Sequence, residues 1–285
     1  MQQKKWISIL LTIFSLLFIS PAHSDDYRVT KVIGDKEKLV LDILSLALSK
    51  SDPQSNVIQY KEALPQSRLI EEVNLDNIDI MWAGADPSLD KTMLPIRIPI
   101  LKGLLGHRIF IIKKENQSRF NNIKTLADLK KLTAGQGTKW GDTKILKSIN
   151  IPVITTLKYP NLFYMLEGER FDYFPRAIHE PWSEVAKRPE LNLAVEKNIM
   201  LVYPFAMYFF VKKDNQILHD KLYKGFEMAI KDGSFDTLFL NNQGIKDALI
   251  KTNIKNRTVI KVPNPAMHPD TPTDREEFWL DTSNL

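Results

Sequence analysis

Segments that favour strands alternate with segments that favour helices over the first third of the chain, and this alternation limits the possible folds more than any other feature. Strands are predicted for residues 27–33, 56–60 and 78–82. Helices are predicted for residues 36–50 and 66–73, where apolar residues recur at helical spacing. The order strand, helix, strand, helix, strand is typical of a parallel sheet covered by helices.

The chain then breaks this pattern at two apolar stretches. Residues 95–112 contain Pro95, Pro99 and two glycines before ending in a strong β run, and residues 201–211 form a second, aromatic β stretch. Between them strands and helices alternate again, so we expect a second, smaller sheet there. Both stretches are interpreted as connections between two lobes. The predicted boundaries are residues 25–108 with 205–285 for lobe 1 and residues 109–204 for lobe 2.

The last third of the chain is predicted to begin with an amphipathic helix over residues 216–231. The final residues, 262–285, contain four prolines, so we expect them to run irregularly over the surface. Phe278 and Trp279 are the residues that could pin this tail to the rest of the protein.

A glycine-rich loop lies near the middle of the chain. Residues 133–145 indicate the end of a strand, a loop with three glycines, and the first turn of a helix that Asp142 or Thr143 could cap. Such a loop presents free N–H groups at the positive end of a helix, where anionic or carbonyl-bearing ligands are commonly held. Thr138, Lys139 and Trp140 add a hydroxyl, a charge and an aromatic ring. An ordinary strand-to-helix connection remains the alternative.

The N-terminus has the pattern of an export signal. Lys4 and Lys5 precede an apolar run over residues 6–19, and the small residues Ala22 and Ser24 fit a signal-peptidase site. The run is shorter than the roughly 20 residues that a membrane helix needs. We therefore predict a signal peptide over residues 1–24, cleaved after Ser24, and a periplasmic or secreted protein without stable membrane insertion. An uncleaved N-terminal anchor is the alternative.

Charge and cysteine content exclude several classes of function. The formal charge of +5 falls to +3 when the two lysines of the signal peptide are removed, which is too little to indicate nucleic acid as a partner. The sequence has no cysteine, so thiol nucleophiles, redox dithiols and sulfur-ligated metals are excluded. No dinucleotide fingerprint, phosphate-binding loop or nucleophile elbow is present.

Five short motifs together resemble the periplasmic solute-binding proteins of amino-acid ABC importers. They are Thr-Leu-Ala-Asp-Leu at residues 125–129, the Gly-Gln-Gly-Thr-Lys-Trp loop at 135–140, Gly-Glu-Arg-Phe-Asp at 168–172, Tyr-Phe-Phe-Val-Lys-Lys at 208–213 and Lys-Asp-Gly-Ser-Phe at 231–235. The resemblance, to family 3 of these proteins, covers about residues 27–242. It implies a two-lobed α/β fold of type II, with a mixed sheet flanked by helices in each lobe and a two-stranded hinge.

On that template, one small molecule binds between the lobes, at loops that follow the strands. The candidate ligand-binding residues are Trp82, Asp86, Arg97, Thr138, Lys139, Trp140, Asp142, Arg176, Glu180 and Tyr203. The aromatic members could stack on a ligand or fill the core. The resemblance further implies a membrane permease or sensor as partner and a monomeric state.

Two positions differ from the amino-acid binders of this family. Lys91 stands where the family's carboxylate-binding arginine is expected, and Ala177 lies near the position of the amine-binding aspartate, with Glu180 as the nearest carboxylate. The cations Arg97, Lys102, Lys139 and Arg176 favour an anionic or carboxylate-bearing ligand, with a solvated or structural role as the alternative for Arg97 and Lys102.

Three functions are therefore open from the sequence. The first is binding of a small polar solute for delivery to an ABC importer, without catalysis. The second is a sensory receptor that docks on a membrane kinase or cyclase, because the same ligand-dependent closure serves both roles. The third is a dehydratase-like enzyme on the same fold, with Glu180 or Asp172 as general acid. His179, Glu180 and Glu184 lack the spacing of a zinc site, so no metal and no cofactor is expected.

Overall fold

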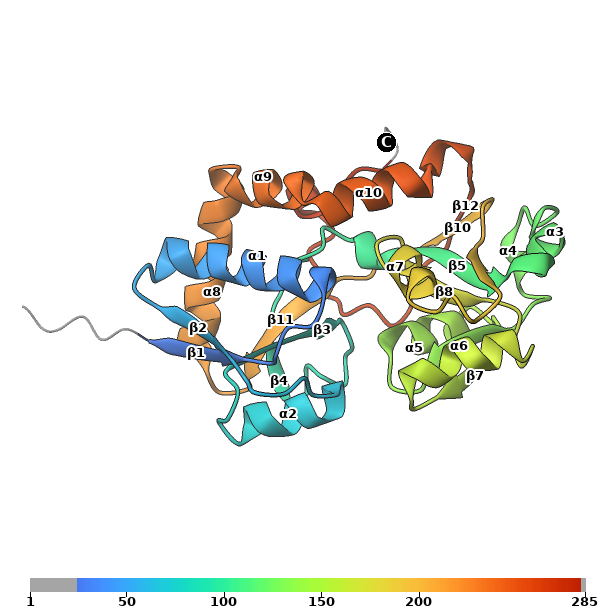
Figure 1. Cartoon of the computed structure of the whole chain (residues 1–285). Helices are drawn as coiled ribbons and strands as arrows, with labels where there is room; N and C mark the ends of the chain where they lie inside the picture. Colours follow the sequence, from blue (N-terminus) through green and yellow to red (C-terminus); the bar gives the residue numbers. More distant parts are fainter. Residues whose placement is uncertain (1–24, 283–285) are drawn as a thin grey trace, which may run out of the picture.

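The computed structural model describes residues 25–282 (Figure 1). The predicted signal peptide, residues 1–24, lies outside the described residues. Within residues 25–282, no helix is both long enough and apolar enough to cross a membrane. Figure 1 shows two bodies side by side, joined by extended segments and by the helices along one edge.

The first body is built on a five-stranded mixed sheet. The strand order is β2 (Asn56–Gln59), β1 (Asp26–Val29), β3 (Ile80–Gly84), β11 (Met207–Lys212) and β4 (Met93–Ile96). β1 runs parallel to β2 and β3, whereas β11 is antiparallel to both β3 and β4. The first sheet thus contains β11, a strand from the last third of the chain.

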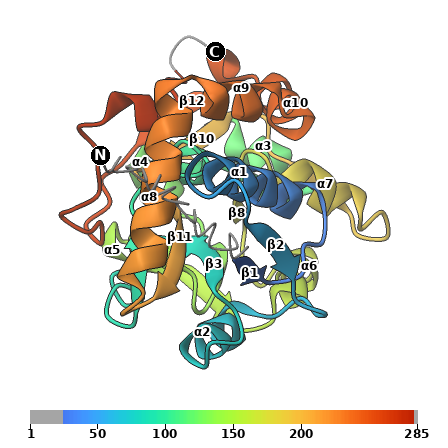
Figure 2. The same cartoon turned by 90° about the vertical axis from the view of Figure 1, so that its left-hand side faces the viewer.

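Helices cover both faces of this sheet. Alternate residues of β11 face opposite ways: Phe209 packs in the core with α1 (Asp35–Ser51) and α8 (Gln216–Lys231), and Phe210 packs with α2 (Gln66–Asn74). α1 and α8 lie against each other (Figure 2). Their close approach occurs at Gly225, where any Cβ would overlap the backbone of Ala47.

The second body has its own sheet. β10 (Ile199–Val202), β5 (His107–Lys113) and β8 (Phe174–Ala177) are antiparallel neighbours, β9 (Leu193–Val195) also pairs with β5, and β12 (Thr258–Lys261) runs parallel to β10. A separate parallel pair joins β6 (Ala134–Gly137) and β7 (Val153–Thr156). The remaining helices of this body are α3 (Gln117–Phe120), α4 (Leu126–Leu129), α5 (Gly141–Ser148), α6 (Tyr159–Glu167) and α7 (Pro181–Ala186).

Two of the chain segments that cross between the bodies lie at the centre of the junction. One connects β4 to β5 and includes a 3₁₀ turn at Leu104–Gly106, and the other connects β10 to β11. They run side by side, because the Tyr203 N–H donates to the Gly106 carbonyl at 3.1 Å. A Cβ on Gly106 would overlap the Tyr203 carbonyl oxygen, so only glycine fits between the two segments. The lobe boundaries stay a proposal; β12, from the segment we assigned to lobe 1, pairs in the second sheet.

Helices α9 (Ser234–Asn241) and α10 (Gln243–Thr252) follow α8, and Figure 1 shows α10 reaching from the first body toward the second. The tail beyond β12 is irregular apart from a 3₁₀ turn at Glu276–Phe278, as predicted. Phe278 is buried in the core and Trp279 packs on Gly103, so these two residues pin the tail as expected.

Two prolines lie within regular elements. Pro175 lies inside β8 and pairs with Phe110; proline is tolerated there because β8 is at the end of the sheet order. Helix α6 begins at Tyr159, with Pro160 in its first turn. The start of α5 differs from the prediction, as described below.

Candidate functional site

The glycine loop brings helix α5 against the first lobe. β6 ends at Gly137, beneath the ring of Trp140, and α5 starts at Gly141. A Cβ on Gly141 would lie 3.1 Å from the carbonyl oxygen of Ala85, which follows β3, and 3.0 Å from the ring of Phe205. The N-terminus of α5 therefore meets the end of β3 at the junction between the lobes.

Asp142 does not cap α5, which corrects our expectation. No side chain caps this helix at Trp140; the buried Asp142 side chain instead bonds to Arg108 of β5, with 2.5 Å between Oδ1 and Nη2. Thr143 is also turned inward and donates from Oγ1 to the Gly137 carbonyl at 2.7 Å. The physical reason is the buried guanidinium group of Arg108, which needs a carboxylate partner more than the helix end needs a cap.

A second buried arginine lies beside the first pair. Arg176 of β8 forms two parallel bonds with Glu184 of α7, at 2.8 Å from Nε and 2.6 Å from Nη2, and its Nη2 lies 3.0 Å from Glu180. Glu180 also lies 3.7 Å from Arg108 through its other oxygen. The carboxylate of Glu180 thus links the two arginines into one charged cluster.

Aromatic rings enclose the Arg176 guanidinium group. Its central carbon lies 5.1 Å from the Trp140 ring centroid, 5.6 Å from that of Tyr159 and 4.9 Å from that of Phe174. The Tyr159 hydroxyl donates to Glu184 at 2.7 Å. Trp140, a candidate for stacking on a ligand, here covers the chain's own arginine.

The cluster contains three carboxylates and two guanidinium groups, all with little exposure. Burial raises the pKa of Asp142, although Arg108 opposes this shift. For Arg176, burial opposes the charge, but Glu180 and Glu184 outweigh it and raise the pKa of the guanidinium group. The cluster thus forms a rigid, ionic wall of the second lobe where it faces the first.

One ion pair joins the two lobes directly. Lys144 of α5 donates from Nζ to both carboxylate oxygens of Asp86, at 2.7 Å each, and Asp86 directly follows the end of β3 and Ala85. The Asp86 side chain is buried, whereas the Lys144 side chain is 52% exposed. Burial would raise the pKa of Asp86, but the bonds from Lys144 and Ser88 outweigh it, so this pKa is lowered.

Aromatic residues fill the rest of the junction. Tyr203 is buried and lies beside Arg108, whose guanidinium carbon is 5.9 Å from the Tyr203 ring centroid. The Phe205 ring is placed between the lobes, since a Cβ on Gly84 would lie 2.6 Å from it. Trp82 of β3 is partly buried and packs edge-on against Phe209.

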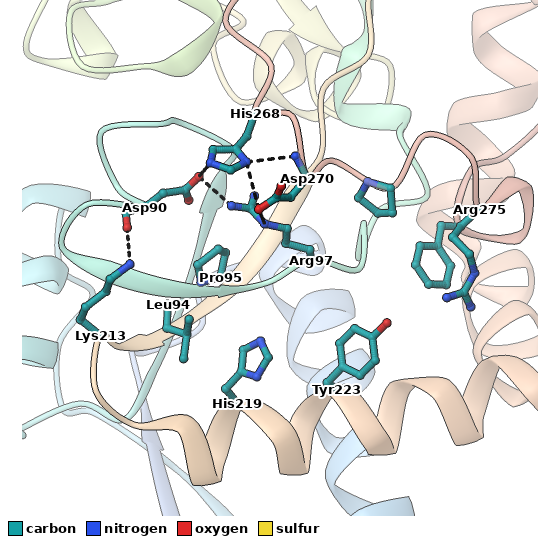
Figure 3. Close-up of a pocket in the computed structure, with 12 residues that line it drawn as sticks. Asp90, Leu94, Pro95, Arg97, Lys213, His219, Tyr223, His268, Asp270 and Arg275 are labelled. Carbon is teal, nitrogen blue, oxygen red and sulfur yellow. Dashed lines mark hydrogen bonds and ion pairs between the residues drawn. The ribbon is translucent and has the colours of Figure 1, made fainter.

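The other candidates lie apart from this junction. Thr138 and Lys139 are exposed at the tip of the glycine loop. Arg97 follows β4 and bonds to Asp90 at 3.0 Å, in a separate pocket between α8, β4 and the tail (Figure 3). The structure therefore gathers Trp140, Asp142, Arg176, Glu180 and Tyr203 in one cluster, places Asp86 at its edge, and separates Arg97 from it.

Sequence reasoning missed several residues of this site: the cations Arg108 and Lys144, and around them Tyr159, Phe174, Glu184 and Phe205. Arg108 lies within a strongly apolar β run, where a single charge signals a buried ion pair or site. Lys144 lies one helical turn after the glycine loop, and nothing local distinguishes it from the neighbouring lysine, Lys147. Among the described residues, no group of three or more metal-ligating side chains could hold a metal ion.

No protein-family model matches the sequence, and no curated protein matches it either. Solved structures do match in fold. An ancestral arginine-binding protein bound to arginine is 18% identical, with a TM-score of 0.56 over 76% of this chain and 98% of that one. A Salmonella typhimurium periplasmic binding protein with high arginine specificity is 14% identical, with a TM-score of 0.55 over 75% and 97% of the two chains.

A third solved structure is the probable amino-acid ABC transporter extracellular-binding protein of Bacillus subtilis, at 16% identity and a TM-score of 0.55, over 79% of this chain and all of that one (100%). The chain therefore has the two-lobed, type II fold of periplasmic solute-binding proteins. The resemblance predicted from the five motifs is confirmed at the level of the fold.

Proposed function

We propose that this protein binds a small, zwitterionic, amino-acid-like solute between its lobes and delivers it to an ABC importer. The observation that carries the proposal is the Asp86–Lys144 ion pair, because its two members come from opposite lobes. When the lobes separate, a buried carboxylate and an ammonium group both lose their partner. A solute with an ammonium group and a carboxylate can replace each partner and draw the lobes together.

The charged cluster supports this role by fixing the position of α5. Arg108 holds Asp142 in the first turn of the helix, so Lys144 is presented from a rigid element. Phe205, which lines a small hollow together with Asp86, and Trp82, on the adjacent strand β3, are the aromatic residues that could contact the solute's side chain. These positions favour a carboxylate-bearing ligand whose cationic partner is Lys144, at the lobe junction, and not Lys139 at the exposed loop tip.

We propose binding without a chemical step. Glu180, the candidate general acid, accepts from the Ala177 N–H at 2.9 Å and contacts Arg176 at 3.0 Å. Both carboxylate oxygens of Glu180 are thus engaged by groups of the chain itself, Oε1 by Arg176 and Oε2 by the Ala177 N–H, so neither is presented to a ligand. The partner is then a membrane permease; a membrane sensor would use the same closure, and co-purification of the mature chain with membrane proteins would separate the two roles.

A thermal-shift series on residues 25–285 tests the solute class. Each amino acid is compared with its N-acetyl form, which lacks the ammonium group, and its amide, which lacks the carboxylate. We expect the intact zwitterion to raise the melting temperature and both derivatives to lose most of the effect. At one hundred times the dissociation constant, binding stabilises the protein by about 2.7 kcal/mol. Equal shifts for a zwitterion and its two derivatives would contradict the proposal.

A further inference from the structure

The C-terminal segment, residues 262–282, begins at the second sheet and immediately contacts a crossing segment. The Val262 N–H donates to the Val202 carbonyl at 2.9 Å, and Asn264 donates from Nδ2 to the Pro204 carbonyl at 2.8 Å. Both acceptors lie at the start of the connection from β10 to β11. The segment thus follows the crossing from the second lobe toward the first.

The middle of the segment contacts the first lobe. Asp270 lies 4.0 Å from Arg97, beyond the end of β4. Arg275 bonds to Glu227 of α8 at 3.1 Å, and the following Phe278 is buried in the core. These contacts tie the segment to two elements of the first sheet's lobe.

The end of the segment returns to the other crossing. The Leu280 N–H donates to the Lys102 carbonyl at 2.9 Å, and the buried Lys102 donates from Nζ to the Glu277 carbonyl at 2.6 Å. The Trp279 ring lies directly on Gly103, where a Cβ would be 2.5 Å from it. Gly103 also has a φ of 77°, a backbone conformation that favours glycine. Thr282 then contacts His107, the first residue of β5, at 3.1 Å.

A hollow of about 550 Å³ separates the middle of the segment from α8 and β4 (Figure 3). Leu94 and Pro95 of β4 form one wall, His219 and Tyr223 of α8 form another, and Pro272 is on the side of the segment. Nearer the start of the segment, Asn264 and Met267 line a small hollow together with Asp86 and Phe205 at the lobe junction. The segment is therefore bonded to both crossings, and between them it passes over the hollow, where the side chains of Asp270 and Arg275 hold it to the first lobe.

We propose that residues 262–282 act as a strap that restrains opening of the lobes, with Trp279 as its anchor. Opening rotates the two crossings relative to each other, and a segment bonded to both must then bend into the hollow or break its contacts. The strap adds one more connection beside the two crossings that touch at Gly106 and Tyr203. This inference concerns lobe motion alone and does not depend on which solute binds.

Distance measurements between spin labels test the strap. Because the sequence has no cysteine, the substitutions Ile58→Cys and Leu157→Cys place one label on an exposed site of each lobe. We expect the unliganded protein to give mainly a short interlobe distance. Trp279→Ala should add a longer-distance population, and Asn264→Ala should shift the distribution in the same direction by a smaller amount.

The matched control is Trp182→Ala, which removes the same ring from α7, away from the strap, and should leave the distance distribution unchanged. Circular dichroism establishes whether each variant is folded. If Trp279→Ala does not fold, Asn264→Ala provides the test. Folded strap variants with the parent distribution would overturn the proposal, as would an equal shift in the Trp182→Ala control. No solute is added, so the result is separate from the test of the proposed function.

Discussion

Asp142 and Arg108, 34 residues apart in the chain, bond at 2.5 Å and are both almost completely buried. Removing one member of a buried ion pair leaves an uncompensated charge, which typically costs about 3–5 kcal/mol. We expect Asp142→Ala to lower the free energy of unfolding by this amount, measured by urea denaturation. Arg108→Met should also lower the free energy of unfolding, because it leaves the Asp142 carboxylate buried without its arginine partner.

The double variant with both Asp142→Ala and Arg108→Met is the internal control. Since neither charge is then left without its partner, its loss of stability should be smaller than the sum of the single losses. Additive losses would show that Asp142 and Arg108 are not coupled, and the rigid-wall interpretation of the cluster would fail.

The Asp86–Lys144 pair predicts a pH dependence with a definite sign. The pKa of Asp86 is lowered in the folded protein, from an unfolded value of about 3.9. The carboxylate therefore stabilises the fold above about pH 4, and this contribution is lost as the pH falls through the folded pKa. Because Lys144 is half-exposed, we expect a contribution of about 1 kcal/mol or less at neutral pH.

The measurement compares the parent protein with Asp86→Asn by denaturant unfolding at several pH values. The difference in unfolding free energy should be largest at neutral pH and should shrink below about pH 4. A difference that stays constant, or grows as the pH falls, would contradict the assigned role of the carboxylate.

Gly106 marks the place where the two crossings touch. A Cβ there overlaps the Tyr203 carbonyl oxygen, and a backbone atom cannot turn aside as a flexible side chain can. We expect Gly106→Ala to cost at least about 1–3 kcal/mol, the usual range for overpacking. Gly244→Ala is the matched control at an exposed position in α10; its Cβ would lie 3.1 Å from Oδ1 of the Asn242 side chain, which can shift where a backbone atom cannot, so its loss of stability should be much smaller. Equal stabilities for the two variants would mean that the crossings can separate freely.

The alternation of strands and helices was predictable because burial imposes a period on the sequence. Helix α1, for example, buries Leu39, Val40, Ile43, Leu44 and Ala47 at helical spacing. Helix α10 has a comparable pattern in Ile245, Ala248 and Leu249, after Asn242 as its N-cap, and was overlooked although the signal was present. β12, by contrast, has only four residues, too few for periodicity to be decisive.

The site was only partly predictable, because its contacts are distant in sequence. The glycine loop was located correctly, yet whether Asp142 caps its helix or pairs with an arginine depends on Arg108, which belongs to another element. In the same way, Lys144 acquires its role from Asp86, 58 residues earlier. Local pattern identified the elements that meet at the junction but not the partner of each side chain.

Calorimetric titration of a stabilising amino acid into three proteins tests the central claim most directly. These are the parent chain, Lys144→Ala, and Lys147→Ala, which removes an exposed lysine from the same helix. We predict tight binding to the parent and to Lys147→Ala, and binding weakened at least about tenfold, or 1.4 kcal/mol, by Lys144→Ala. Equal affinity of all three proteins for the solute would contradict the assignment of the Asp86–Lys144 junction as the binding site.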